Sequence, residues 1–169
     1  MKKTVLIYGF ISGAIAAVLM LATMPFMHTL KGSQGYVVGY TGIVLAALLV
    51  FFGVRSYREN VGDGRITFGR GFAVGILITF ISCTCYVATW QLIYYKLQPG
   101  IADKLFSAPV EKLKAEGVPQ DKIDAAQREV DSFKKMYDKP LVNAVFTFIE
   151  PFPVGLLITL ISAVTLRRK

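Results

Sequence analysis

The chain has few of the residues on which acid–base, nucleophilic and metal chemistry depend. It contains one His and two Cys in 169 residues. Cys83 and Cys85 are two residues apart, so on a helix their side chains point about 200° from each other and cannot bridge or bind one ion. Paired carboxylates and a glycine-rich phosphate loop are also missing. The sequence therefore predicts no catalytic residue, no cofactor and no metal site, and we expect the protein not to be an enzyme.

Charge is nearly absent from four long stretches of the chain. About 20 apolar residues, each rising about 1.5 Å along a helix, cross a hydrocarbon layer of about 30 Å. The hydrophobic share of 54% also exceeds what a soluble core of this size requires. The predicted fold class is all-α, an integral membrane protein with four transmembrane helices in a single membrane domain of residues 1–169. The expected spans cover about residues 5–27, 36–54, 71–95 and 141–166.

The first stretch is interpreted as a span and not as a signal peptide. Its apolar run, residues 5–27, is longer than the roughly 7–15 residues of a signal core. No small-residue cleavage site precedes a polar mature sequence, and the chain continues into further apolar stretches.

The basic residues predict which side of the bilayer each connection occupies. Lys2 and Lys3 precede the first span, four Arg lie between the second and third, and the C-terminus is basic, whereas Lys31 alone separates spans one and two. By the positive-inside rule both termini are cytoplasmic. The net charge of +8 is thus explained largely by these anchors. We expect contact with the lipid bilayer and no nucleic-acid binding, which needs a basic patch interleaved with exposed aromatics.

Residues 96–140 are typical of water-soluble helical structure and are predicted to form an extracytoplasmic helical insert between spans three and four. Pro109 is expected in the first turn of a short helix that ends at Gly117, and Pro119 is expected to begin a second. The second helix carries one apolar stripe with spacings of three and four. The stripe consists of Ile123, Ala126, Val130, Phe133 and Tyr137.

Two interpretations of this stripe are open. The insert is either a hairpin whose two stripes bury each other or rest on the headgroups, or it binds a partner. In the second case the stripe docks another protein or a second copy of the chain, giving a homo-oligomer across a coiled-coil-like seam.

Glu150 is the one ionisable residue within an apolar stretch, and such residues are costly in hydrocarbon. Its distance from the Arg167 anchor places it within a turn of the outer interface. Pro151 and Pro153 loosen the helix beside it. Four polar residues are candidates at a similar depth: His28, Gln91, Asn143 and Lys96. Glu150 either helps to fix a kink, as a hydrogen-bonded or snorkelling carboxylate, or has a proton- or ligand-linked role.

The third and fourth stretches repeat one another. Residues 72–83 and 152–163 share eight of twelve residues, and the predicted topology makes them antiparallel. Two explanations are open: a miniature of the inverted repeats of secondary transporters, or shared packing chemistry between small residues.

Several motifs together resemble an uncharacterised bacterial membrane family, domain of unknown function 4199, along nearly the whole chain. They are the Lys-rich start, Ile66-Thr-Phe-Gly69 before Phe72-Ala-Val-Gly75, the insert ending Asp138-Lys-Pro140, and Glu150-Pro-Phe-Pro-Val-Gly155 running to Leu-Arg-Arg-Lys169. The resemblance implies a multi-pass protein of the bacterial cytoplasmic (inner) membrane and transfers no activity or site residue. The leading hypothesis is a non-enzymatic structural or partner-binding membrane protein. The alternative is a small transporter or channel that uses Glu150 and the proline-broken fourth helix.

Overall fold

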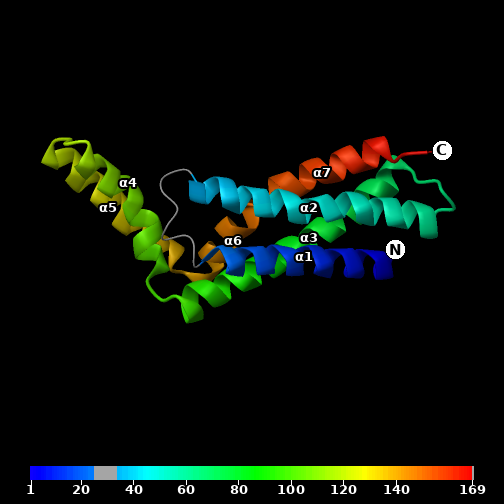
Figure 1. Cartoon of the computed structure of the whole chain (residues 1–169), viewed down its shortest axis with the longest axis horizontal. Coiled ribbons are helices and arrows are strands. Elements are labelled where there is room, and N and C mark those ends of the chain that lie inside the picture. The colour runs from blue at the N-terminus through cyan, green and yellow to red at the C-terminus, as the bar shows by residue number, and fades with distance from the viewer. Residues whose placement is uncertain (25–33, 169) are drawn as a thin grey trace. The chain divides into compact units, whose positions relative to one another are not determined.

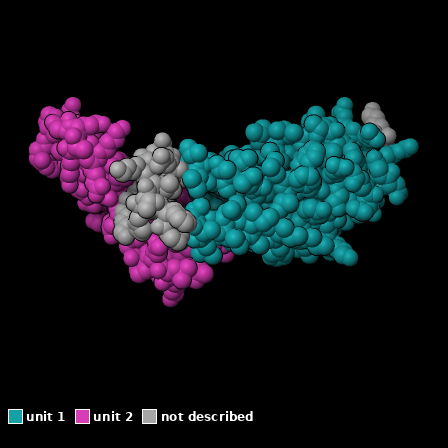
Figure 2. Space-filling view, in the orientation of Figure 1, with its two compact units in different colours: residues 1–87, 148–169 teal, residues 88–147 magenta. Residues whose placement is uncertain are grey.

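The computed structural model describes residues 1–24 and 34–168 of the chain, and these residues are almost entirely helical. They form two compact units, residues 1–87 with 148–169 and residues 88–147 (Figure 2). The helices, seen in Figure 1, are α1 Lys2–Thr23, α2 Gln34–Asn60, α3 Phe68–Leu92, α4 Ile101–Ala115, α5 Gln120–Tyr137, α6 Pro140–Ile149 and α7 Phe152–Thr165. No β-strand occurs in these ranges, only one isolated bridge.

Four helical segments are long and apolar enough to span a membrane, which confirms the predicted all-α class with four candidate transmembrane helices. They are Lys2–Thr23, Val37–Asn60, Phe68–Leu97 and Pro140–Thr165. The third includes a π-helical turn, Ile93–Leu97, after α3. Even the shortest, with 22 residues, extends about 33 Å at about 1.5 Å per residue. Four apolar helices of this length fit a membrane protein.

The fourth span is made of two helices because proline interrupts it. α6 ends at Ile149 and α7 begins at Phe152. Pro151 and Pro153 have no N–H, so the carbonyls of Thr147 and Ile149 lose the helical donors that residues four positions later would supply. The break therefore leaves backbone carbonyls available to other donors at this depth.

In the first unit, a core of seven buried side chains brings the basic segments to one end of the helical bundle. Its members come from the start of α1, the end of α2, the α2–α3 loop, α3 and the end of α7: Val5, Val50, Val54, Ile66, Val74, Ile78 and Leu166. Ile66 and Arg168 also exchange two backbone hydrogen bonds of 3.2 and 3.0 Å. Both chain ends and the α2–α3 loop accordingly lie at the same end of this unit (Figure 1), which we call the basic end.

The two repeated segments pack against each other through reciprocal contacts between Gly and Thr. A Cβ added at Gly75 would lie 2.7 Å from Cγ2 of Thr159, and one added at Gly155 would lie still closer to Cγ2 of Thr79. The two Thr hydroxyls are 3.2 Å apart, within hydrogen-bond distance. The contacts are therefore reciprocal, with the Gly of each segment facing the Thr of the other, and small residues allow the backbones to approach closely.

Ser12 joins three helices of the same unit. Its side chain is fully buried, and its hydroxyl donates to the carbonyl of Ala46 at 2.8 Å and pairs with the Ser82 hydroxyl at 2.9 Å. Gly9 and Gly13 bring α1 against Ile81 and Cys85 of α3. The hydrogen bonds of Ser12 thus add to the close packing that Gly9 and Gly13 allow between α1 and α3.

In the second unit, α4 and α5 pair as a helical hairpin. The chain turns at Gly117, with φ of 68°, and Pro119 immediately precedes α5, as the sequence predicts. The expectation that Pro109 lies in the first turn of α4 is wrong, because α4 begins at Ile101 and contains the proline in its interior. Ile101 and Ala102 are buried, and this burial favours a helix that begins before Pro109. It outweighs the backbone hydrogen bond that the proline cannot donate.

Candidate functional site

Glu150 lies in the break between α6 and α7 and is bound by a tyrosine of α3. The Tyr86 hydroxyl donates to Oε2 of Glu150 at 3.2 Å. Tyr86 lies about 24 Å along the helix from Arg70, and Glu150 about 26 Å from Arg167, at about 1.5 Å per residue. Both groups therefore lie near the boundary of a hydrocarbon layer of about 30 Å, on the side away from the basic end.

Tyr86 also lines a small cavity within the first unit. The cavity has a volume of about 20 Å³, enough for about one water molecule. Pro151 forms part of its wall, and Ser12, Thr79 and Ser82 contribute hydroxyl groups. Tyr86 thus contacts both the Glu150 carboxylate and this small cavity.

The other candidate residues near this depth lie in different environments. Pro151 is buried and Pro153 is exposed. Gln91 Nε2 donates to the carbonyl of Pro140 at 2.9 Å and to Oδ1 of Asn143 at 3.5 Å. Since a carbonyl only accepts, this bond fixes which end of the Gln91 amide faces Pro140. Gln91 therefore braces the start of α6, and His28 lies outside the described residues.

Asn143 has an unusual environment for an amide in a candidate membrane span. Its side chain is 0% exposed, and its Nδ2 has no hydrogen-bond partner in the part of the chain that the structure describes. Because Oδ1 already faces Gln91, turning the amide over would lose that bond. This position was named in the sequence only for its depth, and the pairing with Gln91 depends on how α3 and α6 face each other.

A cluster of aromatic hydroxyl and indole groups holds the α5–α6 turn within the second unit. Trp90 Nε1 donates to the Tyr137 hydroxyl at 3.1 Å, and the Tyr94 hydroxyl donates to Oδ1 of Asp138 at 2.5 Å. The Tyr95 hydroxyl donates to the backbone carbonyl of Asp138 at 3.0 Å. Tyr137, the last residue of the predicted stripe, is thereby part of the internal structure of this unit.

Most of the stripe on α5 faces the interior of its own unit. Ile123 and Tyr137 are buried, and the ring of Phe133 lies 5.1 Å from Phe106 of α4 and 5.7 Å from Phe146 of α6, edge to face. This geometry favours the interpretation in which the two stripes of the hairpin bury each other. The part of the stripe that borders open space is at Val130.

Val130 lines a hollow of about 240 Å³ on the hairpin. The other lining residues are Asp103, Ser107, Gln127, Asp131 and Lys134. Lys134 forms an ion pair with Asp103, and this hydrogen-bonded carboxylate raises the pKa of Lys134. Gln127 donates to Asp131 at 3.0 Å. Two carboxylates and one ammonium therefore surround Val130, the one apolar residue among those that line the hollow, which suits an apolar or cationic side chain.

Sequence reasoning did not identify Tyr86 as the partner of Glu150. The signal that was present is depth, since both residues are separated from basic anchors by similar lengths of helix. Depth alone does not give the rotation of α3 about its axis, on which the contact depends.

No curated protein and no solved structure matches this chain. A family described as Protein of unknown function (DUF4199) matches residues 7–168. This range covers nearly the whole sequence, including all four candidate spans beyond the first turn of α1. The chain therefore belongs to the DUF4199 family.

Proposed function

We propose that this protein is a non-enzymatic membrane protein of the bacterial inner membrane that binds a protein partner through the α4–α5 hairpin. The hollow beside Val130 is the observation that supports this function most directly. It combines a defined volume, one apolar side chain and several charged ones on a segment that is not needed to cross the membrane.

The proposed topology places the basic end in the cytoplasm and the hairpin on the other side. The gathering of basic segments at one end of the first unit supports it, because clustered Lys and Arg favour the cytoplasmic side. α3 leads away from that end, so the chain that follows a single crossing emerges opposite. In a variant without native Cys, a membrane-impermeant maleimide should label Glu116→Cys in intact cells and Lys3→Cys only after lysis. The reverse pattern would contradict the proposed topology.

The residues around the hollow favour recognition of a side chain over recognition of a whole helix. Most of the stripe is already covered by α4 and α6, so a coiled-coil-like seam along its full length is not available. Val130 remains half-buried, with Asp131 beside it and the Asp103–Lys134 ion pair across the hollow. A partner that inserts an apolar or basic side chain there gains both burial and charge contacts.

Site-specific crosslinking from the hollow tests this function. Val130→Cys carrying a short crosslinker should give intermolecular adducts of one defined size in native membranes. Glu129→Cys, at the adjacent exposed position, should not give that adduct. Intrachain adducts alone from Val130→Cys would argue against partner binding through the hollow.

A second candidate function is a small transporter or channel, favoured by the contact between Tyr86 and Glu150 at the edge of a cavity. The antiparallel packing of the two repeated segments also resembles the arrangement of inverted repeats. Proteoliposome flux that is abolished by Glu150→Ala would support this function. For the partner-binding function we expect no flux in either the original or the substituted protein.

A further inference from the structure

We propose that the end of α2 binds the headgroup of one anionic phospholipid, through Arg55 and Arg58. These two residues lie where α2 leaves its apolar stretch, at the basic end of the first unit. The ligand would be a phosphate-containing headgroup with its acyl chain along α2. This site is independent of the hairpin and of Glu150.

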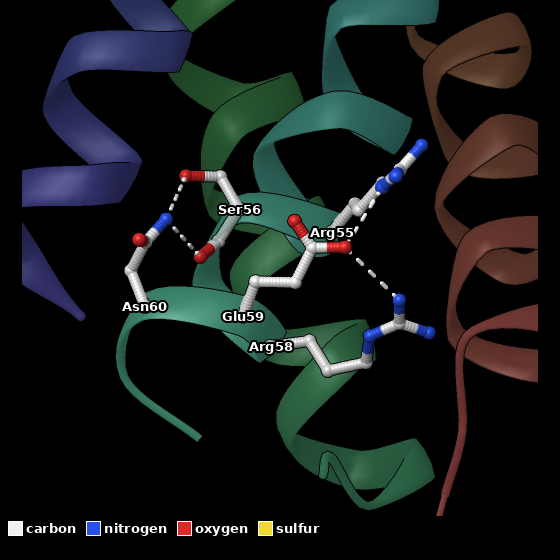
Figure 3. A network of polar contacts seen from close by, with 5 residues as sticks. All are labelled: Arg55, Ser56, Arg58, Glu59 and Asn60. Carbon is white, nitrogen blue, oxygen red and sulfur yellow. Dashed lines mark hydrogen bonds and ion pairs between the residues drawn. The ribbon is translucent and has the colours of Figure 1, made fainter. Parts of the chain in front are cut away.

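The two guanidinium groups share one carboxylate oxygen. Arg55 Nε donates to Oε1 of Glu59 at 2.9 Å, and Arg58 Nη2 lies 3.2 Å from the same oxygen (Figure 3). One negative charge therefore faces two positive charges, which leaves a local excess of one. Planar guanidinium groups with free N–H donors are well suited to phosphate oxygens.

Arg58 has a donor that its own chain does not satisfy. Its side chain is only 16% exposed, and its Nε is buried without a hydrogen-bond partner among the described residues. An unpaired buried donor on a charged group is costly. Because Nε itself is closed to solvent, a headgroup phosphate would reach Arg58 through the part of its side chain that remains exposed.

The surface of α2 below these arginines matches an acyl chain. Leu45, Leu48 and Phe52 are 51%, 41% and 49% exposed, and with Arg55 they follow one another at helical spacing along one face. From Leu45 to Arg55 the helix rises about 15 Å, half the thickness of a hydrocarbon layer of about 30 Å. A free phosphate would use the arginines only, so the apolar face favours a lipid as the source of the phosphate.

The surrounding charge adds to the attraction. The antiparallel bridge between Ile66 and Arg168 brings the basic C-terminal segment to the α2–α3 loop, and a backbone bond of 3.0 Å ties Gly64 to the carbonyl of Arg58. Clustered basic residues beside a membrane span attract anionic lipids. Nucleic acid is less suited to this place, because the site lies level with the lipid headgroups and beside an apolar face.

Native mass spectrometry of the full-length protein in mild detergent tests the proposal. Phosphatidylglycerol should bind in preference to phosphatidylcholine. Arg55→Gln together with Arg58→Gln should weaken phosphatidylglycerol binding by about 30-fold, since each basic residue near a membrane surface contributes about 5-fold. The matched control is Lys112→Gln with Lys122→Gln, which removes the same charge, and an exposed ion pair to Glu116, from the hairpin. This control should change the affinity for phosphatidylglycerol by less than about 2-fold, which corresponds to roughly half the free energy that one basic residue contributes.

Glu59→Gln gives a test that does not depend on the stability of the arginine variants. It frees both guanidinium groups, so phosphatidylglycerol binding should tighten by about 5-fold if the arginines hold the headgroup. Weaker or unchanged binding would overturn the proposal, as would an equal loss in the hairpin control. Competition by inorganic phosphate that abolishes phosphatidylglycerol binding would show that the site recognises free phosphate, and would also overturn it.

Discussion

Replacing Gly75 by Ala is expected to destabilise the contact between α3 and α7. The added Cβ would lie 2.7 Å from Cγ2 of Thr159, whereas ordinary contacts begin at 3.4 Å. The two helices must therefore part by about 0.7 Å, because neither a helix backbone nor a Thr side chain has another direction in which to yield. The same separation stretches the hydrogen bond of 3.2 Å between Thr159 and Thr79.

The expected cost can be worked from these two contributions. Overpacking of a close contact costs typically about 1–3 kcal/mol, and a hydrogen bond between membrane helices contributes about 0.6 kcal/mol on average. The helix propensity of Ala returns up to about 1 kcal/mol, so Gly75→Ala should lower the free energy of unfolding by about 1–2 kcal/mol. Thr159→Ser removes the methyl group that clashes and keeps the hydroxyl, so the double variant should regain most of the loss.

Unfolding by sodium dodecyl sulfate in mixed micelles, followed by far-ultraviolet circular dichroism, measures this free energy. Gly69→Ala is the matched control, because this glycine is in the same helix and a Cβ there has no neighbour within 4 Å. It should be neutral or stabilise by up to about 1 kcal/mol, owing to the helix propensity of Ala. If Gly75→Ala behaved like Gly69→Ala, or Thr159→Ser failed to restore stability, the reasoning about this interface would be refuted.

Three further predictions concern the candidate sites. Tyr86→Phe removes the donor to Glu150 and should cost about 0.6 kcal/mol in the same titration; Glu150→Gln keeps an acceptor and should cost less. Phe133→Ala removes a half-buried ring between two aromatic neighbours and should cost about 2 kcal/mol, less than the about 3–5 kcal/mol of a fully buried ring, so that limited proteolysis cuts the hairpin before the spans. Lys134→Met breaks the ion pair with Asp103. Because that carboxylate raises the pKa of Lys134 above its ordinary value of 10.5, the contribution of the pair is complete at neutral pH. The difference in protease resistance from the original protein should therefore stay constant through the neutral range and disappear only as the pH rises past the raised pKa.

The four spans could be predicted from the sequence because the signal is local. A run of about 20 apolar residues identifies a span whatever surrounds it. The interruption at Glu150 was also visible, since proline cannot continue the hydrogen bonding of a helix. The bundle contacts were only partly visible. The repeated segments suggested shared packing, and their reciprocal Gly–Thr contacts required the structure, because rotation and register of helices are set by all their neighbours together.

The hairpin shows where sequence patterns mislead. Proline is common in the first turn of a helix, so Pro109 was placed there. The structure keeps it inside α4 because Ile101 and Phe106 are buried or stacked against other elements, and this packing outweighs one lost hydrogen bond. The stripe of α5 likewise predicts an apolar face correctly. Which residue covers Phe133 depends on how α4 packs against α5, and the sequence pattern does not give that packing.

Purification of the full-length protein from its own membrane in mild detergent, with mass spectrometry of what accompanies it, tests the proposed function most directly. Val130→Trp fills the hollow with a larger side chain on an otherwise unchanged hairpin. We predict that the original protein copurifies with a second polypeptide in a fixed ratio and that Val130→Trp, still folded by circular dichroism, loses it. Isolation of both proteins with identical composition, alone or with the same companions, would contradict partner binding through the hairpin.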